Sequence, residues 1–210
     1  MGRRKKEPRS VHRQNIALAA SKLFMEKGIA QTSMDDIARE AGYSKATLYV
    51  YFENKEEIVG ILVLESMQKL YDYIEEALEE TVTYRDKYDA ICEALVHYCE
   101  EFPFYFRMAL DKINVDFEEG KYLPEEKETY QVGEQINRRI GEFLQKGMEE
   151  GAFRQDIEVL PTIISLWGML SGIIQLAFAK EEYIENAMGL KRSQFLKQSF
   201  DMLYRSIAVR

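Results

Sequence analysis

The sequence is poor in the residues that build covalently cross-linked or metal-bound scaffolds. Its two cysteines, Cys92 and Cys99, are too few for a disulfide framework, and its two histidines limit any metal site built from imidazoles. Only 4 prolines and 12 glycines occur among 210 residues, of which 46% are hydrophobic, so collagen-like and disordered classes are excluded. The length suits one or two compact domains with a buried core.

Signals for export and lipid attachment are also lacking near the start of the chain. The basic opening MGRRKKEPRS is followed by no long apolar run, which argues against a secretory signal. Lys6 departs from the myristoylation pattern that a glycine at position 2 would require. Together with the low cysteine count, these features predict a soluble protein of the reducing cytoplasm.

Catalytic motifs are missing as well. Glu93 and His97 lie four residues apart with Cys99 close by, but a carboxylate-bridged di-metal bundle needs a second helix of the same kind. The other histidine, His12, lies in the basic N-terminal segment, and neither a zinc spacing, a Gly-rich phosphate loop nor a nucleophile elbow occurs. We therefore expect no enzymatic activity, no cofactor and no metal, and interpret His97 as a hydrogen-bonded helix residue.

Charge is unevenly distributed along the chain. Residues 1–55 carry 11 Lys and Arg against six Asp and Glu, a net +5, whereas the whole chain carries −8, so residues 56–210 carry −13. A basic head on an acidic body is typical of a protein that meets a polyanion with one end. A cationic segment that only aids solubility is the alternative.

Apolar residues recur at helical spacing along nearly the whole chain, which predicts an all-α protein of about nine helices. Gly28 and Gly42 are expected to end the first two helices, because tight reversals favour positive φ. Ser33 with Asp36 predicts a capping box, and Ser44 predicts an N-cap. After a first helix that ends before Gly28, the expected helices are 34–41, 45–52, 54–80, 85–102, 104–110, 124–150, 157–179 and 191–207.

The two short helices, separated by a Gly-containing turn, form a helix-turn-helix candidate. At about 100° of rotation per residue, Leu48 and Phe52 mark the buried side of the second short helix. The opposite arc and its two edges carry Lys45, Ala46, Thr47, Tyr49, Val50 and Tyr51. Such a face suits a DNA major groove, and Lys55 at the start of the next helix is placed to hold a phosphate. A solvated face on a small helical domain is the alternative that spacing leaves open.

The stretch from Ile16 to Glu57 resembles the TetR (tetracycline-repressor-like) family of bacterial transcriptional regulators. The resemblance covers about a fifth of the chain, and its motifs are specific because hydrophobic spacing, turn and recognition residues all match. It is carried by Ile16, Ala19-Ala20, Leu23-Phe24, Gly28, the run Thr32-Ser33-Met34-Asp35-Asp36-Ile37-Ala38, the run Ala41-Gly42-Tyr43-Ser44-Lys45-Ala46-Thr47-Leu48-Tyr49, and Tyr51-Phe52-Glu53-Asn54-Lys55-Glu56-Glu57.

The resemblance implies a three-helix DNA-binding head, joined by a long fourth helix to a helical ligand-binding and dimerisation body. The implied domains are a basic flexible arm (1–10), a helix-turn-helix DNA-binding domain (11–54) and the body (55–210). The positions expected at DNA are Ser33, Ser44, Lys45, Thr47, Tyr49, Tyr51 and Lys55. Val50 occupies a position that is often polar or aromatic in relatives, which leaves base preference there open.

In the body, the family's sensing pocket lies between the helices expected at 85–150 and 157–179. An apolar, aromatic-lined cavity is what a small-molecule site requires. The candidate ligand contacts are Tyr88, Cys92, Leu95, Tyr98, Cys99, Phe102, Phe106, Trp167 and Ser171. Plain core is the alternative for each, because aromatic stripes at helical spacing are common in cores.

The segment 159–179 is apolar enough to suggest a membrane span, but it contains several polar residues and has acidic neighbours, so a buried helix at an oligomer interface is the preferred interpretation. The sequence allows two starts for this helix: Asp156 could be its N-cap, or Pro161 could be its first residue. Gly168, Ser171 and Gly172 would allow close helix approach. The last helix offers a complementary stripe of Phe195, Ser199, Met202 and Leu203. The resemblance then implies a homodimer through the last two helices; without it, a core within one chain is an equal alternative.

The resulting hypothesis is a ligand-responsive DNA-binding regulator: a homodimeric repressor released from a palindromic double-stranded DNA operator by a small, largely apolar effector. An activator, or an all-helical small-molecule carrier or enzyme with a basic head, is the alternative. The identity and charge of the effector, the operator sequence and the target genes are left open by the sequence.

Overall fold

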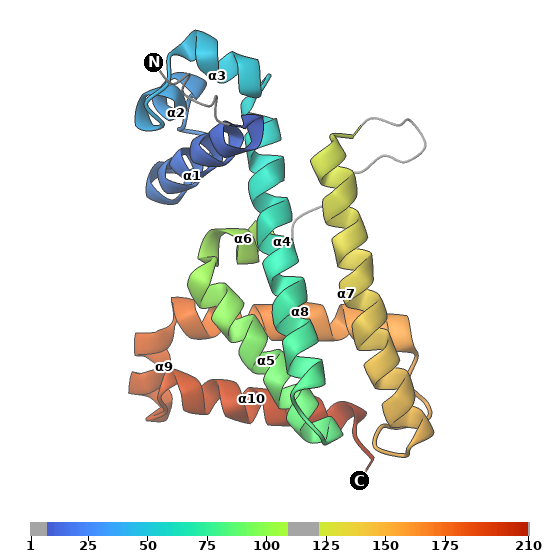
Figure 1. The fold of residues 1–210 in the computed structure, drawn as a ribbon. Helices are drawn as coiled ribbons and strands as arrows, with labels where there is room; N and C mark the ends of the chain where they lie inside the picture. Colours follow the sequence, from blue (N-terminus) through green and yellow to red (C-terminus); the bar gives the residue numbers. More distant parts are fainter. Residues whose placement is uncertain (1–7, 109–121, 210) are drawn as a thin grey trace. The chain divides into compact units, whose positions relative to one another are not determined.

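The computed structural model describes residues 8–108 and 122–209, and confirms the all-α class. Within these residues it contains ten helices (Figure 1). They are α1 (Arg9–Lys27), α2 (Met34–Glu40), α3 (Lys45–Tyr51), α4 (Lys55–Glu79), α5 (Tyr84–Glu101), α6 (Pro103–Met108), α7 (Pro124–Glu149), α8 (Val159–Ala179), α9 (Glu181–Met188) and α10 (Arg192–Ile207). Of the predicted flexible arm, residues 1–7 lie outside the described residues, whereas Arg9 and Ser10 belong to α1.

The helix absent from the sequence-based prediction is α9. The chain leaves the helical conformation at Lys180, with φ −125° and ψ 28°, and re-enters it at once. Glu181 and Glu182 occupy the first turn of α9, where acidic groups interact favourably with the helix dipole. Gly189 ends the helix in the left-handed conformation at φ 65°. The sequence carries little signal for this helix, because its N-cap Lys180 makes no side-chain capping bond and Ile184 is its single buried residue.

The chain divides into two compact units. Residues 8–66 and 122–130 belong to the first, and residues 67–108 and 131–209 belong to the second. The first unit thus extends beyond the predicted boundary at residue 54 and includes the start of α7. Helices α4 and α7 each contribute residues to both units. The assignment of DNA binding and ligand binding to separate domains stays a prediction.

In the first unit, local sequence signals set the ends of the helices. The Ser33 side chain accepts a hydrogen bond from the Asp36 backbone N–H while the Asp36 carboxylate accepts one from the Ser33 backbone, which confirms the capping box. Ser44 caps α3 by accepting from the Thr47 backbone N–H. Gly28 and Gly42 adopt φ of 82° and 73°, as expected where helices end in tight reversals. These short helices are therefore defined by their own caps.

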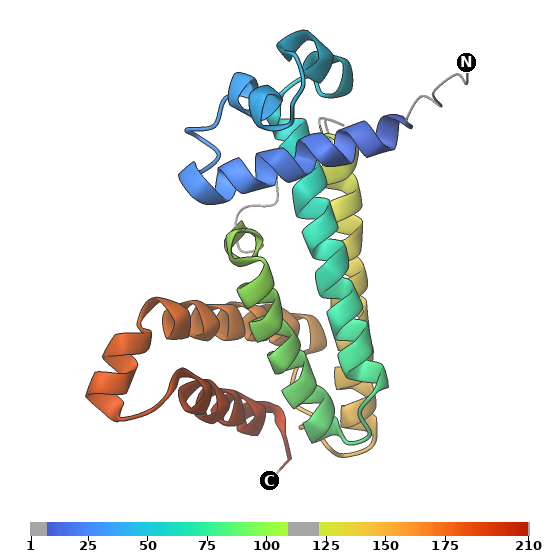
Figure 2. The ribbon, with the colours of Figure 1, turned by 60° about the vertical axis from the view of Figure 1, so that its left-hand side comes forward.

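The second unit is built around a continuous apolar core to which α4, α5, α7, α8 and α10 contribute. Helices α8 and α10 lie side by side, and α9 connects them (Figures 1 and 2). The hydroxyl of Tyr88 in α5 donates a buried hydrogen bond of 3.0 Å to the Phe200 carbonyl of α10. The end of the chain is held by an isolated antiparallel bridge between Ala208 and Phe153, whose ring is completely buried.

Helix α8 begins at Val159 with Glu158 as its N-cap, so neither predicted start is correct. Pro161 is instead the third residue of the helix, within the first turn, where its missing N–H costs no intrahelical bond. Asp156 is engaged elsewhere: its carboxylate accepts from the Arg154 guanidinium at 2.9 and 2.6 Å.

One face of α8 is apolar and lies on the surface of the chain. The helix is long and apolar enough to cross a membrane by length and composition, and only 28% of its most apolar window is buried within this chain. Leu160, Ile164 and Leu176 are exposed at 59%, 57% and 44%. Ser171 and Leu203, which the sequence analysis placed on an interface between subunits, are buried in the chain's own core, so their placement there is wrong.

Candidate nucleic-acid interface

The outward face of α3 is as the helical spacing predicts. Leu48 is fully buried and Phe52 is 1% exposed, so this side of the helix packs into the first unit. On the other side, Tyr49 and Val50 are exposed at 46% and 63%. The helix therefore presents a stripe of side chains to solvent, as a helix that reads base edges must.

Ser33 and Ser44 are the N-caps of α2 and α3, and Thr47 is the third residue of α3. The hydroxyls of Ser44 and Thr47 are 2.7 Å apart and form a hydrogen bond, while the Ser44 oxygen also accepts from the Thr47 backbone N–H at 3.1 Å. Free backbone N–H groups at such helix starts favour anions. These three predicted DNA contacts are thus held in place before any ligand binds.

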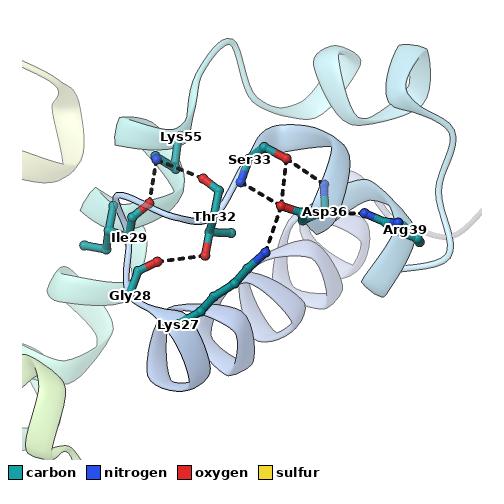
Figure 3. Close-up of polar contacts among 8 residues, drawn as sticks. All are labelled: Lys27, Gly28, Ile29, Thr32, Ser33, Asp36, Arg39 and Lys55. Carbon is teal, nitrogen blue, oxygen red and sulfur yellow. Dashed lines mark hydrogen bonds and ion pairs between the residues drawn. The ribbon is translucent and has the colours of Figure 1, made fainter.

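Lys45 and Lys55 have different surroundings. The Lys45 ammonium pairs with Asp35 at 2.7 Å on the surface, with both side chains more than half exposed, and this pairing raises the pKa of Lys45. The Lys55 ammonium is half-buried and donates to the carbonyls of Ile29 and Thr32 at 2.6 and 2.9 Å (Figure 3). Since an ammonium has three N–H donors, one donor of Lys55 is left for a further partner. Lys55 therefore also ties the start of α4 to the loop between α1 and α2.

Asp36 joins three segments of the first unit. Its carboxylate accepts from Lys27 at 2.9 Å, from Arg39 at 2.5 Å and from the backbone and hydroxyl of Ser33 (Figure 3). The hydrogen bond from Lys27 first, and then those from Ser33, hold the pKa of Asp36 well below its ordinary value. The sequence predicts only the capping box; the bond to Lys27 depends on how the end of α1 meets α2.

We expect Asp36→Asn to lower stability at neutral pH, because an amide cannot replace the carboxylate as acceptor for Lys27, Arg39 and Ser33. The pKa of Asp36 is depressed in the folded state, so its contribution is present above the unfolded-state pKa of about 3.9 and is lost as the pH falls. Thermal unfolding of both proteins from pH 7 to pH 2.5 measures this. A difference in melting temperature that stays constant over that range would contradict the prediction.

The C-terminal end of α3 meets the first turns of α1. Arg9 donates to the Val50 carbonyl at 2.9 Å, and Arg13 donates to the Tyr51 carbonyl at 2.7 Å. The Tyr51 ring is half-buried against His12, with ring centroids 5.2 Å apart. His12 in turn is hydrogen-bonded to the Tyr43 hydroxyl at 2.7 Å. Tyr51 is among the predicted DNA contacts, whereas Arg9 and Arg13 are not, because their only signal in the sequence is their basic character.

Comparison with known proteins bears directly on this interface. Residues 16–60 match the family model described as bacterial regulatory proteins, tetR family. The chain is 28% identical over 197 residues to the uncharacterized HTH-type transcriptional regulator YfiR of Bacillus subtilis, covering 90% of each chain. It is also 38% identical to the regulator TtgR of Pseudomonas putida over 79 residues, which are 38% of this chain and 37% of that protein.

Solved structures agree over almost the full length. The fold is similar to that of the TetR-family regulator PfmR from Thermus thermophilus, at 26% identity and a TM-score of 0.67, over 90% of this chain and 97% of that one. The ketosteroid regulator KstR2 of Mycobacterium tuberculosis aligns with a TM-score of 0.69 at 19% identity, covering 98% of both chains. The chain belongs to the TetR family.

As a TetR-family protein, the chain is a DNA-binding transcriptional regulator and not an enzyme. The family binds DNA operators and effector ligands, and its members are soluble bacterial regulators, which implies the cytoplasm. The carrier or enzyme considered as an alternative is thereby excluded. Among the described residues, no group of three or more His, Cys, Asp or Glu side chains is placed to hold a metal ion.

The second unit of this TetR-family protein contains a cavity of about 30 Å³ between α4, α5, α7 and α8. Its walls are formed entirely by apolar and aromatic side chains: Ile74, Tyr88, Ile91, Leu95, Ile140, Phe143, Leu144, Ile163, Leu166, Trp167 and Leu170. The Tyr88 hydroxyl is occupied by its bond to the Phe200 carbonyl. Among the residues that the structure describes, no charged side chain lines the cavity, so a charge buried against them would lack a partner.

Of the nine predicted ligand contacts, Tyr88, Leu95 and Trp167 line this cavity. The other six lie outside its walls: Cys92, Tyr98, Cys99, Phe106 and Ser171 are buried, and Phe102 is half-buried. Burial raises the pKa of the Cys92 thiol to about 12 and that of Cys99 to about 11, so neither is a reactive thiolate at neutral pH. The sequence missed the aliphatic wall because Ile and Leu give no signal that separates a cavity from ordinary core.

Proposed function

We propose that the protein is a homodimeric repressor that leaves a palindromic operator when a small, largely apolar effector enters the cavity of the second unit. The observation that carries the DNA-binding part is the outward face of α3, whose exposed Tyr49 and Val50 lie opposite the buried Leu48. Thr47 and Tyr49 would contact base edges. Ser33, Ser44, Lys45, Tyr51 and Lys55 would contact phosphates, which fix the register of the protein on the duplex.

The effector class is supported by the chemistry of the cavity walls. Because the wall residues within 8–108 and 122–209 offer neither a charge nor a free polar group, the buried part of the effector would be uncharged and apolar. Ligand pockets typically enclose about 300–1,000 Å³, far more than the cavity of about 30 Å³ found here. An effector would therefore have to push α5, α7 and α8 apart. A regulator of similar fold, FadR of Bacillus subtilis, was solved with stearoyl-CoA, at 18% identity and a TM-score of 0.67.

The dimer is supported by the exposed apolar face of α8. Gly168 and Gly172 lie along this face, and a β-carbon added at either position would meet no atom of the described residues within 4 Å. Flanking them, Ile164 and Leu176 are exposed at 57% and 44%. A groove of glycines between apolar ridges lets a partner helix approach closely, and Met202 of α10, exposed at 62%, extends the apolar surface. A two-fold dimer would place two α3 helices about 34 Å apart, one turn of DNA.

Release would follow from differential affinity. The effector would bind more tightly to a conformation in which the two DNA-binding heads have the wrong separation for the operator. The affinity for the operator then falls by the difference in the effector's binding free energy between the two conformations, commonly about 1–3 kcal/mol.

An activator is the second candidate, because the chain is 32% identical over 93 residues to the transcriptional activator FasR of Mycolicibacterium smegmatis. Operator placement decides between the two roles.

Fluorescence anisotropy with the DNA that flanks the protein's own gene tests the proposal. Specific binding at nanomolar concentration and moderate salt supports a regulator acting at that site, whereas weak binding that salt abolishes overturns it. A reporter gene placed under the control of the same DNA then distinguishes repression from activation.

The fluorescence of Trp167 tests the proposed effector site. Trp167 is the single tryptophan of the chain and lines the cavity, so its fluorescence should change when an apolar ligand binds. Unchanged emission at a ligand concentration that releases DNA would contradict the proposed site.

We expect Lys55→Ala to weaken DNA binding on every sequence and to reduce the slope of log affinity against log salt concentration by about one, because one phosphate contact is lost. The same substitution also removes the bonds to Ile29 and Thr32, so the melting temperature is measured alongside. A lower affinity with an unchanged salt slope would mean that Lys55 contacts no phosphate and only holds the loop between α1 and α2.

A further inference from the structure

The end of α3 is held by side chains from outside the helix-turn-helix. The last carbonyl groups of any α-helix lack partners within the helix. In α3 two of them are satisfied by α1: Arg9 donates to the Val50 carbonyl and Arg13 to the Tyr51 carbonyl. Cations at a helix C-terminus also interact favourably with the helix dipole. Since α3 has only 7 residues, these two bonds restrain a large part of its length.

The Arg13 guanidinium is itself fixed on two further sides. It stacks over the Phe52 ring, with its central carbon 4.3 Å from the ring centroid. Its second terminal nitrogen donates to the Glu125 carboxylate of α7 at 3.2 Å, in a pair whose side chains are only 27% and 18% exposed. A guanidinium carries donors in a rigid planar fork, so one side chain can hold a carbonyl and a carboxylate at once. A lysine at this position would be a point charge without that fork.

We infer that Arg13, oriented by Glu125, is a positioning residue for DNA recognition. It holds the end of α3 so that the face bearing Thr47 and Tyr49 keeps its direction, and it does so through α7 and not through contact with DNA. The inference rests on the proposed reading of DNA by α3. It assigns a role in DNA binding to Glu125, an acidic residue outside the helix-turn-helix and 112 positions from Arg13 in the sequence.

Glu125→Gln gives a test in which positioning and simple electrostatics predict opposite results. Removing a negative charge from a DNA-binding unit should strengthen binding to any duplex, because a polyanion is repelled less. If Glu125 orients Arg13, the substitution should instead weaken specific binding by roughly tenfold, because the neutral amide oxygen of glutamine accepts from the guanidinium more weakly than a carboxylate does. Glu128→Gln, an exposed position on the same helix, makes the same change in charge and serves as the control.

The probe is a labelled duplex that the wild-type protein selects from a randomised library, compared with a scrambled duplex of equal length. We expect Glu125→Gln to lose affinity for the selected duplex only, with an unchanged salt slope, while Glu128→Gln binds as tightly as wild type or more tightly. Equal behaviour of the two variants overturns the inference. A wild-type protein that selects no sequence overturns the proposed function itself.

Arg13→Lys and Arg13→Met provide a second measurement that does not depend on Glu125→Gln folding well. For a positioning residue, both variants should lose specific affinity to a similar extent with the wild-type salt slope, since the lysine keeps the charge but not the fork. If Arg13 instead contacts a phosphate, lysine should preserve binding and methionine should reduce the slope by about one, which would overturn the inference.

Discussion

Gly147→Ala should destabilise the protein by about 3 kcal/mol, the upper part of the range for overpacked cores. A β-carbon at Gly147 would lie 2.2 Å from the Phe153 Cδ2 atom and 2.4 Å from its Cε2 atom, far inside van der Waals contact. The ring cannot retreat easily, because it is completely buried and packs against Phe143 and Tyr84, with centroids 5.2 and 5.5 Å away.

The destabilisation should appear as a melting temperature lower by about 6–12 °C for a chain of this size. Gly133→Ala on the same helix is the matched control, because an added β-carbon there meets nothing within 4 Å. That variant should be stabilised by about 0.5–1 kcal/mol, since alanine loses less backbone entropy on folding than glycine. If Gly147→Ala has the same melting temperature as wild type, Phe153 is free to shift and the packing at this site is looser than the structure indicates.

Gly168→Glu is expected to convert the proposed dimer into monomers at micromolar concentration and to weaken operator binding by about 100-fold or more. Within the chain the new side chain has open space, so the fold should be retained. In a two-fold dimer that closes over α8, two carboxylates would be buried without partners, at a cost of several kcal/mol. Monomers would also lose the gain in affinity from binding two half-sites together.

Sedimentation velocity and anisotropy on the same samples measure both effects. Gln145→Glu adds the same charge to an exposed position of α7 and should leave association and DNA binding unchanged. A Gly168→Glu protein that remains dimeric and binds the operator with wild-type affinity would exclude this face of α8 as the interface.

Most of the first unit was predictable because its signals are local. The capping box of Ser33 and Asp36, the N-cap Ser44 and the glycine at position 42 act on residues within four positions of themselves. The buried side of α3, marked by Leu48 and Phe52, follows from helical spacing alone. Helix α9 was not predicted because it lacks such signals: no side chain caps its start, and Ile184 is its single buried residue.

The cavity was predictable only in part, for a different reason. Of the residues predicted to contact a ligand, Tyr88, Leu95 and Trp167 line the cavity, whereas Cys92 and Ser171, which belong to the same helices, do not. A helix buried on more than one side has several apolar faces, and spacing does not tell which of them borders a void. That distinction depends on how closely the side chains of neighbouring helices fill the space between them.

By itself, the sequence determined the helical class, the ends of the short helices and the face of α3 that points to solvent. These properties arise from backbone conformations and side-chain spacing within a few residues. Only the tertiary structure decided that Arg13 joins Tyr51 to Glu125 and that Lys55 is bonded to Ile29 and Thr32. Hydrogen bonds between residues 23 to 112 positions apart exist only once packing has brought their helices together, and no local pattern encodes which partners meet.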